Sequence, residues 1–321
     1  MSGSAASGRA VDAAAVSSWL RDRGVYVAFL AVVLFNLVFT SNFATTGTLF
    51  TQLVQVSPVV LVSLGMALAI GTEGIDLSVG SVMALASAAL PLYIGYGWPV
   101  AVAVALGVGI FAGLLSGGLI SFFGIQPIIA TLGLLVAGRG LAQIFAGGQL
   151  LIVTDPVILS LARERVLGVP APVVVAAVAA LVVGFVVRRT TFGRYVVSIG
   201  GNRTASLLSG HPVRRTLLAV YAASGLLAAV AGIVATARLG ASDPSNIGVL
   251  IELSAIAAVV VGGTPLTGGR VRILGTVVGA LLMQLISATF IMNDLPFAWA
   301  QVLTALIVLL AIYVQKGRGA A

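Results

Sequence analysis

Long apolar stretches with almost no charge restrict most strongly how this chain can fold. Val25–Ser41 and Ala171–Val187 are examples, and each approaches the length of about 20 residues with which an α-helix crosses a bilayer. Charged residues make up 8% of the chain, against about 25% in soluble domains, and the mean hydropathy is +1.16. We therefore predict an all-α protein that spans a membrane many times.

Ten transmembrane helices are expected from the apolar pattern. They are placed at about 25–41, 49–71, 75–95, 98–123, 126–147, 171–187, 215–237, 250–264, 271–292 and 297–314. The 39 glycines suit such a bundle, because small residues let neighbouring helix backbones approach closely. The expected organisation is a cytoplasmic tail at 1–24, one transmembrane domain at 25–315 and a second cytoplasmic tail at 316–321.

Lysine and arginine are distributed unevenly between the two sides of this arrangement. With the N-terminus in the cytoplasm, thirteen of the seventeen lie on the cytoplasmic side, while Arg163, Arg165 and Arg238 lie outside and Arg139 lies within a span. Positive charge favours the cytoplasmic side of membrane proteins. We therefore expect both termini in the cytoplasm and Trp98 at the outer interface. The pI of 10.8 then needs no nucleic-acid partner.

Several kinds of chemistry are excluded by residue type. The chain has no cysteine, and His211 is its only histidine, so disulfides, thiolate nucleophiles and Cys- or His-based metal sites are not expected. The glycine-rich stretch Gly262–Arg270 lacks the Gly-Lys-Ser/Thr ending of a P-loop, whose lysine reaches the phosphates. We expect no enzymatic activity, no metal and no cofactor on this chain.

An acidic motif interrupts the apolar sequence at Gly74–Ser81. It contains Asp76 and Ser78 and follows Glu73, and the order Ile-acid-Leu-Ser recurs five spans later in Ile251–Ser254. Charges at membrane depth are costly and mark functional sites. Because the two copies are an odd number of spans apart, their helices enter from opposite faces. This pattern is typical of two inverted five-helix repeats, whose broken helices flank a pathway near the midplane.

A second interpretation of the same residues stays open. Acid-x-Ser is also an ordinary helix start, in which the side chains cap free backbone N–H groups. Glu73, Asp76, Ser78, Glu252 and Ser254 are thus candidates for the pathway or for half-helix caps. The roles are compatible, since a capped half-helix can line a cavity. For Asp76 we expect the cap.

Arg139 lies inside the fifth span, with Gln143 one turn further along the same face. An intramembrane guanidinium must face protein, water or a carboxylate. Glu252, Asp243 and Asp76 are the available partners, and the sequence does not choose among them. A structural pairing is favoured over direct contact with a transported molecule, and both residues remain candidates for the pathway.

The longest basic loop, at about 188–214, contains a short helix signal. Gly201-Asn202 interrupts the chain, the next residues have the composition of an amphipathic helix, and Gly210 ends it. A helix that docks on a partner is favoured over a solvated loop or one lying on anionic lipid. The candidate docking residues are Gly201, Asn202, Arg203, Ala205, Leu207, Leu208, Ser209 and Gly210.

Over about residues 25 to 315 the chain resembles the permease subunit of bacterial ABC sugar importers, in the ribose/galactofuranose-type branch. The resemblance is carried by Gly74–Gly80, Ile125-Gln126-Pro127 with Ala137–Gly140, Gly200–Gly210, and Glu252–Ala257 with Val261–Thr264. It implies a type II ABC importer-like fold in the bacterial inner membrane. It also implies a second permease subunit (identical or not), cytoplasmic ATPases that hold ATP and magnesium, and an extracytoplasmic sugar-binding protein.

The resemblance further implies that Gly201–Gly210 contains the coupling helix that docks on the ATPase. Two positions depart from the family pattern: Glu73 stands where glycine is usual, and Ser254 where aspartate is usual.

The expected function is import of a monosaccharide, a pentose or hexose such as galactofuranose or ribose, by alternating access driven by the partner ATPases. One open alternative is an ion- or proton-coupled secondary transporter with Glu73, Asp76 and Glu252 as coupling acids. Another is an ABC permease for nucleosides or branched-chain amino acids. A purely structural membrane protein is disfavoured by the intramembrane charges.

Overall fold

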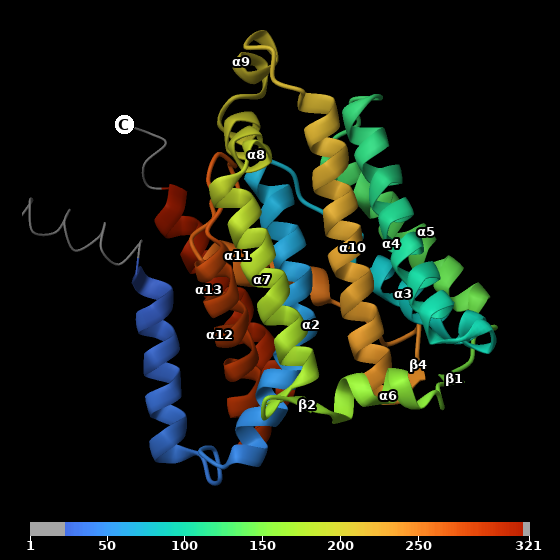
Figure 1. Cartoon of the computed structure of the whole chain (residues 1–321). Helices are drawn as coiled ribbons and strands as arrows, with labels where there is room; N and C mark the ends of the chain where they lie inside the picture. The colour runs from blue at the N-terminus through green and yellow to red at the C-terminus, as the bar shows by residue number, and fades with distance from the viewer. Residues whose placement is uncertain (1–22, 317–321) are drawn as a thin grey trace, which may run out of the picture.

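The computed structural model describes residues 23–316, so the predicted tails fall almost wholly outside the described residues. The described chain is a bundle of helices with two small strand pairs (Figure 1). It begins with helix Arg23–Phe39. The elements that follow are α2 (Thr46–Gly71), α3 (Val79–Tyr93), η1 (Ile94–Tyr96), α4 (Trp98–Ser121), α5 (Pro127–Phe145), β1 (Leu151–Ile152), α6 (Pro156–Arg163), β2 (Arg165–Val166), β3 (Val169–Pro170), α7 (Ala171–Arg189), α8 (Thr191–Gly201), α9 (Arg203–Leu208), α10 (Val213–Leu239), β4 (Ala241–Ser242), α11 (Ile251–Val261), α12 (Ile273–Met292) and α13 (Phe297–Lys316).

Every predicted span coincides with an apolar helix of the described chain. Seven of these helices, α2, α3 with η1, α4, α5, α7, α10 and α12, are long and apolar enough to cross a membrane. The other three apolar segments, Arg23–Phe39, Ile251–Val261 and Ala298–Ala311, are shorter. A mostly helical fold with seven candidate membrane spans is therefore confirmed, and the count of ten crossings stays a prediction.

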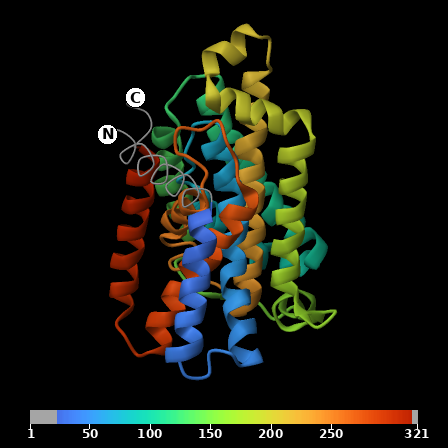
Figure 2. The same cartoon turned by 90° about the vertical axis from the view of Figure 1, so that its left-hand side faces the viewer.

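The centre of the bundle is formed by α2, α3 and α10, which are the most deeply buried of the long helices. α10 packs against α4, α2 and α3, while α12 packs against α2, α11 and α13. In Figure 1, α4 and α5 lie to one side of this centre, and α11, α12 and α13 lie to the other. Figure 2 shows helix Arg23–Phe39 in front of the latter group. Its Asn36 Nδ2 donates to the hydroxyl of Thr289 on α12 at 2.7 Å.

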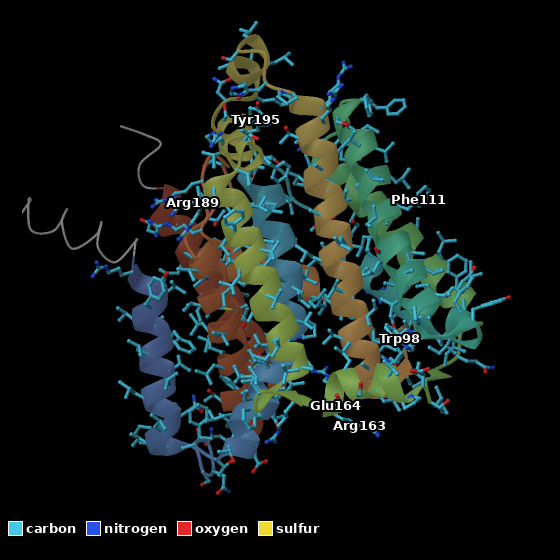
Figure 3. The ribbon with its side chains drawn as sticks, in the orientation of Figure 1. Trp98, Phe111, Arg163, Glu164, Arg189 and Tyr195 are labelled. Atoms are coloured by element: carbon cyan, nitrogen blue, oxygen red, sulfur yellow. The ribbon has the colours of Figure 1, made fainter. Side chains whose placement is uncertain are left out.

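The two ends of the bundle are formed by different elements. α8 and α9 project from one end, and α6 with the β2–β3 hairpin covers the other (Figure 1). Figure 3 shows Arg189 and Tyr195 near the first end and Arg163 and Glu164 at the second, with Trp98 in the same half as Arg163. Arg189 and Arg163 thus lie at opposite ends of the bundle, and which end faces the cytoplasm stays a prediction.

A short antiparallel pair, β1 with β4, joins two connections that are far apart in sequence. Leu151 pairs with Ser242 and Ile152 with Ala241, so the segment after α5 is tied to the segment after α10. α6 begins next to this pair because Asp155 accepts hydrogen bonds from the N–H groups of Val157 and Ile158, at 2.9 and 3.0 Å.

Candidate functional site

The segment around Gly74 begins with the C-terminal cap of α2. The N–H of Glu73 donates to the carbonyl of Ile70 at 2.9 Å, and that of Gly74 to the carbonyl of Ala69 at 3.0 Å. Glu73 has φ +64°. This is the Schellman pattern, in which the residue in the left-handed region is usually glycine. Glu73 is exposed and belongs to this turn, which explains why glycine suits the position.

Asp76 is buried and holds the loop before α3 against α10. Its Oδ1 accepts hydrogen bonds from the N–H and the hydroxyl of Ser78, at 3.0 and 2.5 Å. Its Oδ2 accepts one from the hydroxyl of Ser224 on α10, at 2.7 Å. The hydroxyl of Ser78 makes no cap bond to the helix, so it serves Asp76 instead. The Asp76 carboxylate therefore joins the N-cap residue Ser78 to α10, and it lies two residues before that cap.

The two acidic motifs occupy different positions on their helices. Ile75–Ser78 precedes α3, which was expected to start at about residue 75 and begins at Val79, whereas Ile251–Ser254 forms the first turn of α11. Asp76 therefore lies in a loop, and Glu252 lies on a helix.

α3 and α11 nevertheless start in direct contact. A Cβ on Gly80 would collide with the carbonyl oxygen of Gly248, and a Cβ on Gly248 would collide with that of Gly80. From this point α3 leads through η1 toward Trp98, while α11 leads to the 262–272 loop, which meets α8 at the other end. The two helices therefore run from a shared start toward opposite ends of the bundle.

Glu252 lies at this contact. Its side chain is 8% exposed, and its Oε2 lies 2.6 Å from the place where a Cβ of Gly80 would stand. Oε2 has no hydrogen-bond partner among the described residues. The carboxylate sits in the first turn of α11, where the helix dipole favours negative charge.

Arg139 of α5 binds the segment that leads into α11. Its Nη1 donates to the carbonyl oxygens of Ile247 and Pro244, at 2.6 and 2.8 Å. Among the described residues, the guanidinium forms no ion pair with a carboxylate. The sequence led us to expect a carboxylate partner for Arg139. The guanidinium instead donates its hydrogen bonds to backbone carbonyls. Gln143, one turn on, is exposed.

A cavity of about 640 Å³ lies between α2, α10, α11 and α12. Of the seven residues predicted for the pathway or the half-helix caps, Ser254 alone lines this cavity. Apolar side chains, including Met83 of α3 and Ile251, form much of its surface. Its polar lining residues are Gln55, Arg238, Asp243, Asn246, Ser254 and Gln284.

Sequence reasoning missed most of these polar residues because it followed the charges. Gln55 and Gln284 sit inside the apolar stretches of α2 and α12, and an amide at membrane depth was a signal that could have been used. Arg238 had been assigned only to the outer side. Ser224, which binds Asp76, carries no local signal at all.

A second hollow of about 670 Å³ lies between α11, α12 and α13 and is mostly apolar. Val249 and Ser254 line both this groove and the central cavity. Val249 and Ser254 therefore lie between the groove and the cavity on one side of α11.

The basic loop is more helical than expected. α8 fills Thr191–Gly201, and the short helix predicted between Asn202 and Gly210 is α9. Asn202 caps α9 by accepting the N–H of Ala205 at 2.8 Å, and Gly210 follows it with φ +76°. Arg203 begins the helix and Ser209 caps its end. Leu207 and Leu208 are 62% and 84% exposed, so α9 presents apolar side chains beyond the bundle.

Three glycines join α8 to the rest of the bundle, and we call Gly71, Gly200 and Gly269 the glycine junction. Gly71 ends α2, Gly200 is in the last turn of α8, and Gly269 is in the loop before α12. A Cβ on Gly200 would collide with the carbonyl oxygen of Gly71 and stand 2.5 Å from the nitrogen of Gly269. Backbones of this closeness require glycine.

Comparison with known proteins places this architecture. The family described as the permease component of branched-chain amino acid transport systems matches residues 48–312. The galactofuranose transporter permease of Escherichia coli K12 is 40% identical over 82% of this chain and 78% of its own length. The fructose import permease of Bifidobacterium longum is 37% identical, over 83% and 79%, and the ribose import permease of E. coli K12 is 35% identical, over 93% and 95%.

No solved structure matches the chain. The resemblance drawn from Gly74–Gly80 and the other motifs is confirmed by these relatives, and so is the expectation of a permease subunit without enzymatic activity. This chain belongs to the permease-component family, alongside permeases named for sugars.

Proposed function

We propose that this chain is the membrane-spanning subunit of an ABC importer that passes a monosaccharide into the bacterial cytoplasm by alternating access. The observation that carries the proposal is the shared start of α3 and α11 beside a cavity lined by amides and hydroxyls. Half-helices that run to opposite faces from a central site are typical of transporters built from inverted repeats. Relatives named for galactofuranose, fructose and ribose supply the substrate class.

The proposal includes ten spans in two inverted five-helix repeats, with both termini in the cytoplasm. Glu73, Asp76, Ser78, Arg139 and Glu252 then shape the half-helix ends, while Ser254 faces the cargo. Gln143 is exposed on α5, so we place it on the outer surface of that helix and give it no part in the pathway.

The partners proposed are of three kinds. Cytoplasmic ATPases, which hold the ATP and magnesium, dock on α9 through Leu207 and Leu208. A sugar-binding protein delivers the cargo at the end that carries α6. A second permease, identical or not, covers the apolar groove beside α11 and closes the cavity that this groove adjoins. Lipid surrounds the remaining apolar faces.

Transport by the reconstituted complex tests the function. The chain is placed in vesicles with the ATPase and binding protein from its gene neighbourhood, and sugar uptake is measured with and without ATP. Uptake that needs both ATP and the binding protein is expected. Equal uptake without ATP would defeat the proposal, and uptake that a protonophore abolishes while ATP is maintained would favour a secondary transporter.

Orientation has its own test, because the chain contains no cysteine. Leu208→Cys and Leu167→Cys place single thiols at residues 84% and 99% exposed, at opposite ends of the bundle. In intact cells, an impermeant maleimide should label the Leu167→Cys variant and leave the Leu208→Cys variant unlabelled. The opposite pattern would reverse the proposed topology.

A further inference from the structure

Two cavities meet at the end of the bundle that carries α6. An outer chamber of about 450 Å³ lies between the first half of α2, the α6–β2 segment and the end of α10, where these elements come together in Figure 1. The central cavity lies beyond it. Gln55 of α2 and Arg238 of α10 line both spaces, so these two side chains form the boundary between them.

Gln55 is held in place by a glutamine of another helix. Nε2 of Gln284 on α12 donates to Oε1 of Gln55 and to Oε1 of Gln52, at 2.9 Å in each case. A carboxamide offers two N–H donors and an acceptor oxygen. Within the described residues, Nε2 of Gln55 and Oε1 of Gln284 therefore keep unused hydrogen-bonding capacity beside the cavity that both residues line.

The guanidinium of Arg238 also has no hydrogen bond or ion pair to any residue between 23 and 316. It is exposed to the space that the two cavities share. The five N–H donors of Arg238, the free donors of Gln55 and the free acceptor of Gln284 are thus available at the boundary between the two cavities. Donors and an acceptor on one surface match hydroxyl groups, because a hydroxyl both donates and accepts.

Charge distinguishes a neutral ligand from an anionic one. The outer chamber is lined by Arg163, Arg165 and Arg238 and by no carboxylate. The central cavity is lined by Arg238 and by Asp243, so its charged side chains balance. An anion would be attracted into the outer chamber but would gain little from moving inward. A neutral molecule with several hydroxyls suits the boundary and the central cavity alike.

We propose that Gln55, Gln284 and Arg238 form a selectivity site that binds a neutral polyhydroxylated molecule through adjacent hydroxyls as it passes from the outer chamber to the central cavity. This inference rests on the proposed function and adds the residues that read the cargo. The amide of Gln55 and the fork of Arg238 bind one edge of the molecule. Apolar neighbours such as Met83 contact its C–H face.

The test uses two matched glutamines. Gln55→Met and Gln52→Met each remove one hydrogen bond to Gln284 and keep an unbranched side chain, but Gln52 lines neither cavity. D-ribose, D-fructose and D-galactose are first screened for uptake by the wild-type complex in vesicles. The variants are then assayed with the transported sugar at a concentration that does not saturate uptake. Gln55→Met should lower the uptake rate about tenfold, because the exposed amide that would bind the hydroxyls of the sugar is lost. Gln52→Met should stay within about twofold of the wild type.

A deoxy analogue of the same sugar provides the second measurement. The preference for the parent sugar over its analogue should fall toward one in Gln55→Met and persist in Gln52→Met. The binding protein is the same in every assay, so its own discrimination cancels from this comparison. Equal preferences in the two variants would overturn the inference. Gel filtration and basal ATPase activity report whether each complex is intact.

Arg238 separates hydroxyl binding from attraction of an anion. Arg238→Lys keeps the charge but loses the planar fork, and Arg238→Gln loses both. Both variants should lower uptake of the neutral sugar by at least about fivefold, the loss expected when about 1 kcal/mol of binding disappears. Full uptake by Arg238→Lys with loss in Arg238→Gln would show that charge alone matters, and would overturn the inference. A wild-type complex that takes up none of the three sugars would instead defeat the proposed function.

Discussion

The backbone N–H of Gly269 donates to the carbonyl oxygen of Gly71 over 3.1 Å, which fastens the loop before α12 to the end of α2. Gly200 packs against both residues, and α8 leads directly into α9. Backbone contacts at the glycine junction therefore link α8 to the end of α2 and to the loop before α12. If α9 docks on an ATPase as proposed, this is the route by which its movement would reach both segments.

Neighbouring glycines allow a direct test of this junction. A Cβ on Gly200 collides with backbone, whereas a Cβ on Gly201 meets nothing within 4 Å. Gly200→Ala is expected to destabilise the protein by about 1–3 kcal/mol, the usual cost of overpacking, and to raise the ATP used per sugar transported. Gly201→Ala should match the wild type in thermal unfolding and in coupling. Similar behaviour of the two variants would contradict the junction.

The exposed leucines of α9 predict how the ATPase attaches. Leu208→Asp should leave folding unchanged, because the side chain is 84% exposed, and should abolish co-purification of the ATPase. Leu167→Asp is the control, since Leu167 is 99% exposed at the opposite end of the bundle. Thermal unfolding of the isolated permease and pull-down of the ATPase measure the two effects. An intact complex with Leu208→Asp would remove α9 from the docking surface.

Asp76 is expected to tolerate loss of its charge better than loss of its hydrogen bonds. Asparagine can still accept from Ser78 and can donate to the hydroxyl of Ser224, so Asp76→Asn should cost about 1 kcal/mol. Asp76→Ala leaves buried donors without a partner and should cost about 2–4 kcal/mol. Unfolding of the purified protein in detergent gives the order. A transport defect in Asp76→Asn as severe as in Asp76→Ala would assign a role to the charge itself.

Replacing Glu73 should stabilise the protein. Its φ of +64° is costly for a residue with a Cβ, by about 1 kcal/mol, and glycine removes that cost. Glu73→Gly is therefore expected to raise the melting temperature by a few degrees, while Glu164→Gly, at an exposed glutamate with φ −78°, should lower it slightly. A lower melting temperature for Glu73→Gly would mean that its carboxylate makes a contact that outweighs the strain.

The helices of this fold were readable because each apolar stretch carries its own signal. Local hydropathy predicts the positions of the spans. The cap residue Asn202 and the terminating Gly210 likewise predict α9 from nearby sequence alone. α8 was missed because it is short, contains three glycines and lies in a basic loop, so its apolar residues gave no span signal. The start of α3 was placed too early because hydropathy does not show that Asp76 folds back on Ser78.

The site was less predictable because it depends on residues brought together from distant spans. Nothing near Asp76 in the sequence points to Ser224, and nothing near Arg139 points to the carbonyls of Pro244 and Ile247. The cavity likewise gathers uncharged amides from α2 and α12, which composition averages hide. Charge marked the neighbourhood of the site, and tertiary packing chose its lining.

The apolar groove beside α11 bears on how the cargo of this permease could change in evolution. Val249 and Ser254 border both the groove and the central cavity, so a second permease that covers the groove, as proposed, would contact residues that shape the chamber. The same chain beside a different neighbour would enclose a differently shaped space without any change in its own sequence. Exchange of partners, as well as substitution of residues, is therefore a route by which this permease could acquire new cargo.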